Sequence, residues 1–185
     1  MSLLKRLFGT TPVLQARNPP VDDHSFAQSS IILVAFLCLL SKKSGTHQSD
    51  NLQFAGRLLY HFCVKAMGHP QSLQWCLGRL EEMNDDVFED EFDEEAFCDD
   101  FLSVNKMLMS EMRSSILVYL AAFNFWLTAN YGHAKDNEEY IQTRVEIIEK
   151  YQRFSGRFEH SPTKDEIHSI SHSAERLLEE IMKLK

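Results

Sequence analysis

Three side chains near the end of the sequence have a spacing that suits a metal site. In DEIHSISH, Asp165, His168 and His172 follow the pattern Asp-x-x-His-x-x-x-His, which places all three on one face of a helix. Two imidazoles one turn apart can bind zinc or nickel, and a carboxylate can supply a third ligand. An apolar stripe lies on the opposite face, so a solvated helix surface is the alternative interpretation.

A second unusual segment is NDDVFEDEFDEEAFCDD, residues 84–100, which places acids around three phenylalanines without one basic residue. It has no glycine and lacks the spacing of a calcium-binding EF-hand loop. In one straight helix, Phe88 and Phe97 would face opposite ways, because nine residues at about 100° each place them about 180° apart around the helix axis. We therefore predict a break, with a new helix beginning near Asp93, where negative charge is favoured by the helix dipole.

The residues just before this break have no such structural explanation. They are Phe88, Glu89, Asp90, Glu91 and Phe92. An exposed aromatic ring surrounded by acids can anchor a positively charged partner, since a patch of one sign steers the opposite sign toward it. We predict a partner-binding surface here, and a plain solvated face is the alternative.

The remaining chemistry-bearing residues show no catalytic motif. No nucleophile elbow, phosphate loop or HExxH pair occurs, so we expect no enzymatic activity and no cofactor. We interpret His61 as a core histidine bonded to a backbone carbonyl, and Trp75 and Trp126 as core residues. The four cysteines are far apart with no CxxC pair, which favours buried free thiols in a reducing cytosol.

Composition points to helices. The chain has 185 residues, 44 % of them hydrophobic, with 7 glycines and 5 prolines, which is enough for one buried core and favours an all-α fold. The net charge of −8, from 27 acids against 19 bases, argues against nucleic acid as the ligand, because phosphate binding depends on Lys and Arg. A protein partner with a basic surface is compatible with this negative charge.

The chain divides into an N-terminal segment, residues 1–24, and a bundle domain, residues 25–185. Residues 2–8 (SLLKRLF) form a short amphipathic segment, and residues 9–23 hold three prolines, as a linker does. The segment could dock on the bundle or make at most a peripheral contact with a membrane. It does not resemble a secretory signal, so we expect a cytoplasmic protein, with the inner membrane as a site of peripheral contact.

Periodic apolar residues and capping residues predict about seven helices in one bundle. The first should run from Ser25 to Lys43, and the second from Ser49 or Asp50 to a stop at Gly68. The next three helices should begin at Pro70, near Asp93 and at Ser110. The last two should begin at Asp136 or Asn137 and at Thr163. The apolar stretches 31–40 and 115–129 are shorter than the roughly 20 residues that span a membrane, so we expect core helices.

Three of these helices have predicted buried stripes that the structure can check directly. The stripes are Phe97, Phe101, Val104 and Leu108; Val145, Ile148 and Tyr151; and Ile167, Ile170, Ala174, Leu177 and Ile181. Thr163 and Glu166 should form a capping box at the start of the last helix.

An internal echo links two halves of the chain. Residues 31–62 and 115–151 each contain an apolar helix, a glycine-bearing turn, an Asp-Asn pair and a second amphipathic helix. The echo suggests two helical hairpins around one core.

This layout resembles the TerB-like helical family, which includes tellurite-resistance TerB proteins and a related domain of membrane-tethered J-domain co-chaperones. The resemblance covers roughly residues 25–155. It implies an α-bundle of two hairpins and a bacterial, cytoplasmic role in stress response or as a scaffold near membrane complexes. In that family each turn reads Asp-Gly and then Glu, and its carboxylates gather a divalent cation.

The chain departs from that motif. Ser44 and Tyr131 stand before the two glycines in place of aspartate, and Asn51 replaces the first glutamate. Asp136, Glu138 and Glu139 remain near the second turn as the carboxylates available to a divalent cation. From the whole sequence we predict a non-enzymatic interaction or scaffold module. The alternatives are a divalent-metal-binding helical protein, and an acidic inhibitor or immunity protein that binds a basic toxin.

Overall fold

The computed structural model of the protein describes residues 20–45, 48–131, 138–154 and 163–183. These residues form seven α-helices and no strand, so the all-α prediction is confirmed. The helices are α2 (Asp23–Lys43), α3 (Gln48–His61), which continues into the π-helical segment η1 (Phe62–Met67), α4 (Leu73–Val87), α5 (Glu94–Asn105), α6 (Ser110–Tyr131), α7 (Glu138–Phe154) and α8 (Lys164–Lys183).

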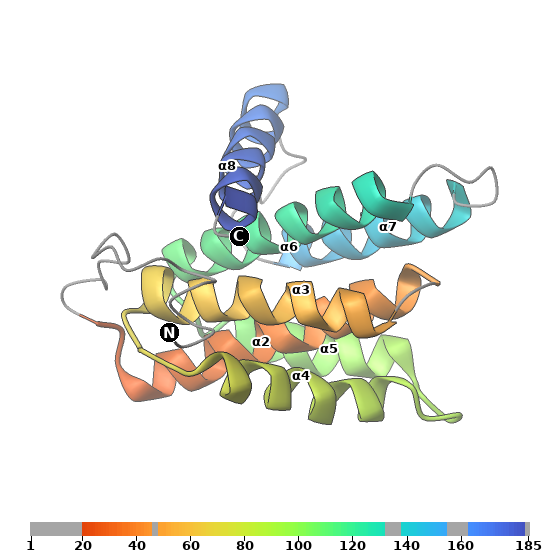
Figure 1. Ribbon diagram of the computed structural model, residues 1–185, viewed down its shortest axis with the longest axis horizontal. Helices are drawn as coiled ribbons and strands as arrows, with labels where there is room; N and C mark the ends of the chain where they lie inside the picture. Colours follow the sequence, from red (N-terminus) through yellow and green to blue (C-terminus); the bar gives the residue numbers. More distant parts are fainter. Residues whose placement is uncertain (1–19, 46–47, 132–137, 155–162, 184–185) are drawn as a thin grey trace.

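Helix α2 lies at the centre of the bundle. It packs against α3, α4, α5, α6 and α7, and Figure 1 shows it largely covered by its neighbours. A helix that is apolar on nearly all sides must be covered in this way. By length and composition α2 could cross a membrane, and 72 % of its most apolar 18-residue window is buried inside the bundle, as in a core helix.

The two predicted hairpins are present. Helix α2 packs on α3, α6 packs on α7, and the two pairs contact each other because α2 packs on both α6 and α7 and α3 packs on α6. Helices α4 and α5 also pack on α2, and α5 in addition contacts α7. One core therefore joins the first hairpin to the second, as the internal echo predicts.

The bundle begins a few residues earlier than the predicted boundary at residue 25. The side chain of Val21 is buried, and its N–H donates to the carbonyl of Met67 at 2.9 Å. Asp22 caps α2 by accepting from the backbone N–H of Ser25 at 2.9 Å. The end of the proline-containing segment thus belongs to the folded domain.

The turn between α2 and α3 is closed by neutral side chains. Asn51 is buried and donates to the Ser44 hydroxyl at 2.8 Å, and that hydroxyl donates to the Ser41 carbonyl at 2.6 Å. Gln48 bonds both the hydroxyl and the carbonyl of Ser41. The two positions where the TerB-like motif has carboxylates therefore hold the neutral side chains of a polar network.

Helix α3 changes to π-helical geometry before it ends at Gly68, which has a φ of 70°. The predicted stop is therefore correct. The predicted start of the next helix at Pro70 is wrong, because α4 begins at Leu73 and is capped by Ser72, whose hydroxyl accepts from the Trp75 N–H at 3.0 Å. A serine side chain satisfies a free helix N–H, which proline cannot do.

The buried face of α5 is displaced by one residue from the predicted stripe. Asp93 caps this helix through the N–H groups of Glu95 and Ala96, as expected. Its buried residues are Cys98, Leu102 and Asn105, whereas Phe97, Phe101 and Val104 are only partly buried. The three aromatic rings of Phe92, Phe97 and Phe101 pack edge to face or tilted on one another instead. Leu108, the last residue of the predicted stripe, follows the helix and is buried as predicted.

Helix α7 shows the same displacement at the first two positions of its predicted stripe, whereas the third, Tyr151, is buried as predicted. Its buried residues are Arg144, Ile147 and Tyr151, whereas Val145 and Ile148 are partly exposed. Arg144 donates to the Asn124 side chain of α6 at 2.9 Å. The predicted start at Asp136 or Asn137 and the glycines at 132 and 156 lie outside the described residues.

Helix α8 packs on α6 through Ala174, Leu177 and Ile181, while its first half projects from the bundle (Figure 1). The predicted capping box is present, because Glu166 accepts from the Thr163 N–H at 2.8 Å. The predicted burial of Ile167 is wrong, since it is 48 % exposed. The apolar stripe runs along the whole of α8, but the bundle covers only the second half of the helix.

Candidate interaction surface

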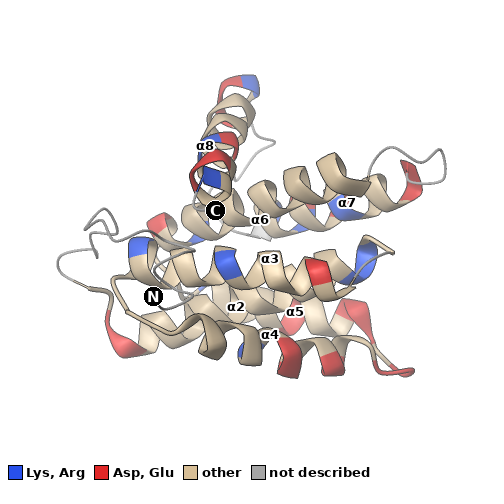
Figure 2. Cartoon of the chain, in the orientation of Figure 1, with Lys and Arg blue, Asp and Glu red and all other residues tan. Residues whose placement is uncertain are grey.

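The five residues predicted to bind a partner lie together where α4 ends and α5 begins. We call residues 88–92 the acidic ridge. Phe88 follows the last residue of α4 and is 43 % exposed. Glu89, Asp90 and Glu91 are exposed and Phe92 is half-buried. Figure 2 shows acidic residues gathered at this end of the molecule.

Lys42, in the last turn of α2, holds the acidic ridge against the core. Its ammonium donates to the carbonyl of Val87 at 2.6 Å. It also lies 4.2 Å from the centre of the Phe92 ring and 5.5 Å from that of Phe88, within the range of a cation–π interaction. One lysine of the central helix therefore fixes the end of α4 and both aromatic rings.

Other charges near the ridge are already engaged in the structure. Lys43 pairs with Glu94 at 2.5 Å, and the Asp93 carboxylate caps α5. In contrast, within the described part of the chain no cation lies within ion-pair distance of Glu89, Asp90 or Glu91. Their negative charge is available to a ligand in solution.

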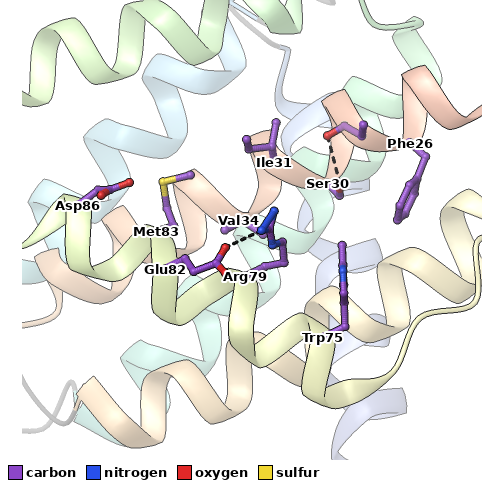
Figure 3. A pocket seen from close by; sticks show the side chains of 10 residues that line it. Phe26, Ser30, Ile31, Val34, Trp75, Arg79, Glu82, Met83 and Asp86 are labelled. Atoms are coloured by element: carbon purple, nitrogen blue, oxygen red, sulfur yellow. Dashed lines mark hydrogen bonds and ion pairs between the residues drawn. The ribbon is translucent and has the colours of Figure 1, made fainter.

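A groove lies next to the ridge, between α2 and α4 (Figure 3). Its volume is about 320 Å³ and most of its surface is apolar. It is lined by Phe26, Ala27, Ser30, Ile31 and Val34 of α2 and by Trp75, Arg79, Glu82, Met83 and Asp86 of α4. We call it the α2–α4 groove.

The walls of the groove include apolar side chains that the fold leaves uncovered. Ile31 is 44 % exposed although it belongs to the most apolar helix. Trp75, which the sequence places in the core, is only half-buried and stacks on Phe26 with ring centres 6.2 Å apart. At the rim, Arg79 pairs with Glu82 at 2.5 Å, and Asp86 completes the edge.

The residues predicted as metal ligands are not gathered into a site. Asp165, His168 and His172 are exposed on the projecting half of α8. Glu138 and Glu139 are exposed at the start of α7, and Asp136 lies outside the described residues. Among the residues that the structure describes, no three His, Cys, Asp or Glu side chains are grouped so that they could hold an ion.

His61 has a partner other than the predicted backbone carbonyl. Its Nδ1 lies 2.6 Å from the Tyr119 hydroxyl, and its Nε2 lies 3.3 Å from a carboxylate oxygen of Glu180. Burial lowers the pKa of His61, and the nearby Glu180 opposes that effect. The imidazole thus links α3 to α6 and α8.

The four cysteines are free and buried, as predicted. Burial raises the pKa of Cys38, and burial together with nearby acids raises that of Cys98 to about 11. A hydrogen bond with Cys76, together with burial, raises the pKa of Cys63. Thiols in this state are poor nucleophiles, because the thiolate is the reactive form.

No family model, curated protein or solved structure matches the chain. The candidate surface therefore depends on its own geometry. Two parts of it were missed by sequence reasoning, namely the role of Lys42 and the α2–α4 groove. The pair Lys42-Lys43 ahead of an acidic stretch was a usable signal for the first, whereas the groove depends on how α4 lies on α2.

Proposed function

We propose that this protein is a non-enzymatic interaction or scaffold module of a bacterial cytoplasm, and that its partner is a protein with a basic surface that binds the acidic ridge. The observation that carries this proposal is the exposure of Phe88 beside three carboxylates that pair with no cation among the described residues. Aromatic rings are enriched among the residues that dominate binding energy at protein interfaces.

The anchoring of the ridge supports a binding role. Because Lys42 already fixes both rings and the end of α4, little side-chain freedom remains to be lost when a partner binds. Preorganisation of this kind increases affinity by lowering the entropic cost of association. The carboxylates would raise the association rate of a basic partner, an effect that salt screens.

The cellular setting is proposed on the TerB-like resemblance and on the four buried free cysteines, which are typical of a reducing compartment. A cytoplasmic stress-related scaffold, or one at a membrane complex, is compatible with both. An inhibitor or immunity protein would use the same ridge against a basic toxin. The genes that neighbour the coding sequence distinguish these two roles.

Affinity capture from native lysate tests the proposal. The wild-type chain should retain a reproducible partner, and Phe88→Ala or the charge-neutral variant Glu89→Gln/Asp90→Asn/Glu91→Gln should lose it. Met107→Ala is the matched control, because Met107 is 72 % exposed on the α5–α6 connection and lies outside the ridge. The proposal fails if no partner is retained, or if all variants retain the same one.

A further inference from the structure

The α2–α4 groove has the chemistry of a site for a short amphipathic segment. Its floor and walls are apolar, with Ile31 and Trp75 left partly open to solvent. Its rim carries two carboxylates, Glu82 and Asp86, against one cation, Arg79. A fitting occupant would insert a few aliphatic or aromatic side chains and present basic residues to the rim.

The same chain contains one segment of that description. Leu3, Leu4, Leu7 and Phe8 are spaced so that a helical turn would align them, and Lys5 and Arg6 stand between them. The apolar residues match the groove and the two cations match its acidic rim. We propose that residues 3–8 of this chain bind in the α2–α4 groove and cover it.

The tether permits this contact. Residues 9–19 separate the segment from the first described residue, and these 11 residues can span at most about 36–40 Å. The groove begins at Phe26, one turn into α2, and follows that helix to Val34, a distance of roughly 12 Å along the axis. The segment can therefore reach the whole groove.

The tether also makes a weak contact sufficient. A short linker holds its ligand at an effective concentration of the order of mM. A segment with only millimolar intrinsic affinity would then occupy the groove for a large part of the time. The bound segment would compete with any external helix that binds the same groove. This competition does not depend on whether the acidic ridge binds a partner.

Trp75 provides a direct readout in the full-length chain. The chain has 2 tryptophans, so Trp126→Phe leaves Trp75 as the only tryptophan, and selective tryptophan excitation then reports on it alone. In that background, Leu4→Asp/Leu7→Asp should shift the Trp75 emission to the red and cause a loss of protection from acrylamide quenching. Val13→Asp/Leu14→Asp, which makes the same kind of change in the linker, should cause neither. Circular dichroism verifies that each variant is folded.

A charge exchange and a crosslink make the test specific. Lys5→Glu/Arg6→Glu should lose the protection, and adding Glu82→Lys/Asp86→Lys should restore it. In a separate pair, Leu7→Cys with Ile31→Cys should form a disulfide under mild oxidation faster than Leu14→Cys with Ile31→Cys.

Three results would overturn the proposal. The first is equal Trp75 emission and quenching in the segment variant, the linker variant and their common background. The second is protection that grows with protein concentration, which would assign the groove to a second copy. The third is protection that arises only when anionic phospholipid vesicles are added, which would assign the segment to a lipid surface.

Discussion

Gly45 shows how one residue joins the two hairpins. It follows α2 with a φ of 70°, and a Cβ at this position would lie 2.6 Å from the ring of Tyr140 in α7. We expect Gly45→Ala to lower the free energy of unfolding by about 1–3 kcal/mol, because a side chain here is strained in the backbone and meets the ring. Urea unfolding measures the change.

Gly78 is the matched control for that substitution. It lies inside α4, and a Cβ added there meets nothing within 4 Å. Gly78→Ala should raise the free energy of unfolding by about 0.5–1 kcal/mol, since glycine is entropically unfavourable within a helix. An equal loss of stability in both variants would contradict our account of Gly45.

His61 should make the fold sensitive to acid. Burial holds its pKa below the ordinary value of 6.5, so the unfolded chain binds a proton more readily than the folded one. The contribution of the neutral ring to stability is complete above pH 6.5 and is lost as the pH falls from there toward the pKa of the folded state.

The measurement is the free energy of unfolding against pH for wild type and His61→Gln. Three other ionisable groups lie near the ring, namely Glu180 of α8, Lys65 of η1 and Tyr119 of α6, and all three remain in the variant. We expect the free energy of unfolding to decrease more in the wild type than in His61→Gln as the pH falls below 6.5. Parallel curves would show that His61 does not carry this dependence.

Single polar residues also explain where the sequence misplaced a buried face. Asn105 is buried in α5 because its side-chain oxygen accepts from the Tyr151 hydroxyl at 2.8 Å. Arg144 is buried in α7 because Asn124 and Thr128 accept from its guanidinium. A prediction from the hydrophobic pattern assigns such polar residues to the surface. The predicted buried face is then displaced by one residue from the observed one.

At the scale of the element, Lys42 should decide how firmly the acidic ridge is held. Lys42→Met removes a charged hydrogen bond to the Val87 carbonyl and the cation above two rings. We expect a loss of about 1–2 kcal/mol and faster hydrogen exchange at the amides of residues 88–92. Lys43→Met, which removes a partly exposed ion pair with Glu94, should cost less than about 1 kcal/mol. A larger effect at Lys43 would reverse our assignment.

Helix α8 should be stabilised only along the half that lies on α6. Ile181 is 1 % exposed and Ile167 is 48 % exposed, on the same apolar stripe. We expect Ile181→Ala to cost about 2–5 kcal/mol, as deletion of buried atoms leaves a cavity, and Ile167→Ala to cost less than about 0.5 kcal/mol. Thermal unfolding compares the two, and similar losses would mean that the first half of α8 is also covered.

Helix boundaries were predictable wherever a local cap sets them. Asp93 begins α5, Thr163 begins the last helix with its capping box, and Gly68 ends the second. Each depends on groups within a few residues, so the sequence contains the whole cause. The start of α4 was misplaced because proline and serine both suit a helix start, and only Ser72 accepts a hydrogen bond from a free N–H.

At the scale of the whole molecule, the sequence predicts the two hairpins and their common core but not the α2–α4 groove. The hairpins follow from two very apolar helices that must be covered on several sides. The groove exists because α4 leaves Ile31 and Trp75 partly uncovered, and that depends on helix placement. The acidic ridge was predictable as a surface, since its phase break and charge are local.

The most direct test of the proposed interaction places a probe at position 88 itself. Phe88 is replaced with a photoreactive phenylalanine analogue, and the full-length chain is irradiated in native lysate at low and at high salt. We predict one reproducible crosslinked protein with a basic surface, weaker at high salt, and no such product from a probe at Met107. The same products at both positions, or none at position 88, would contradict the account.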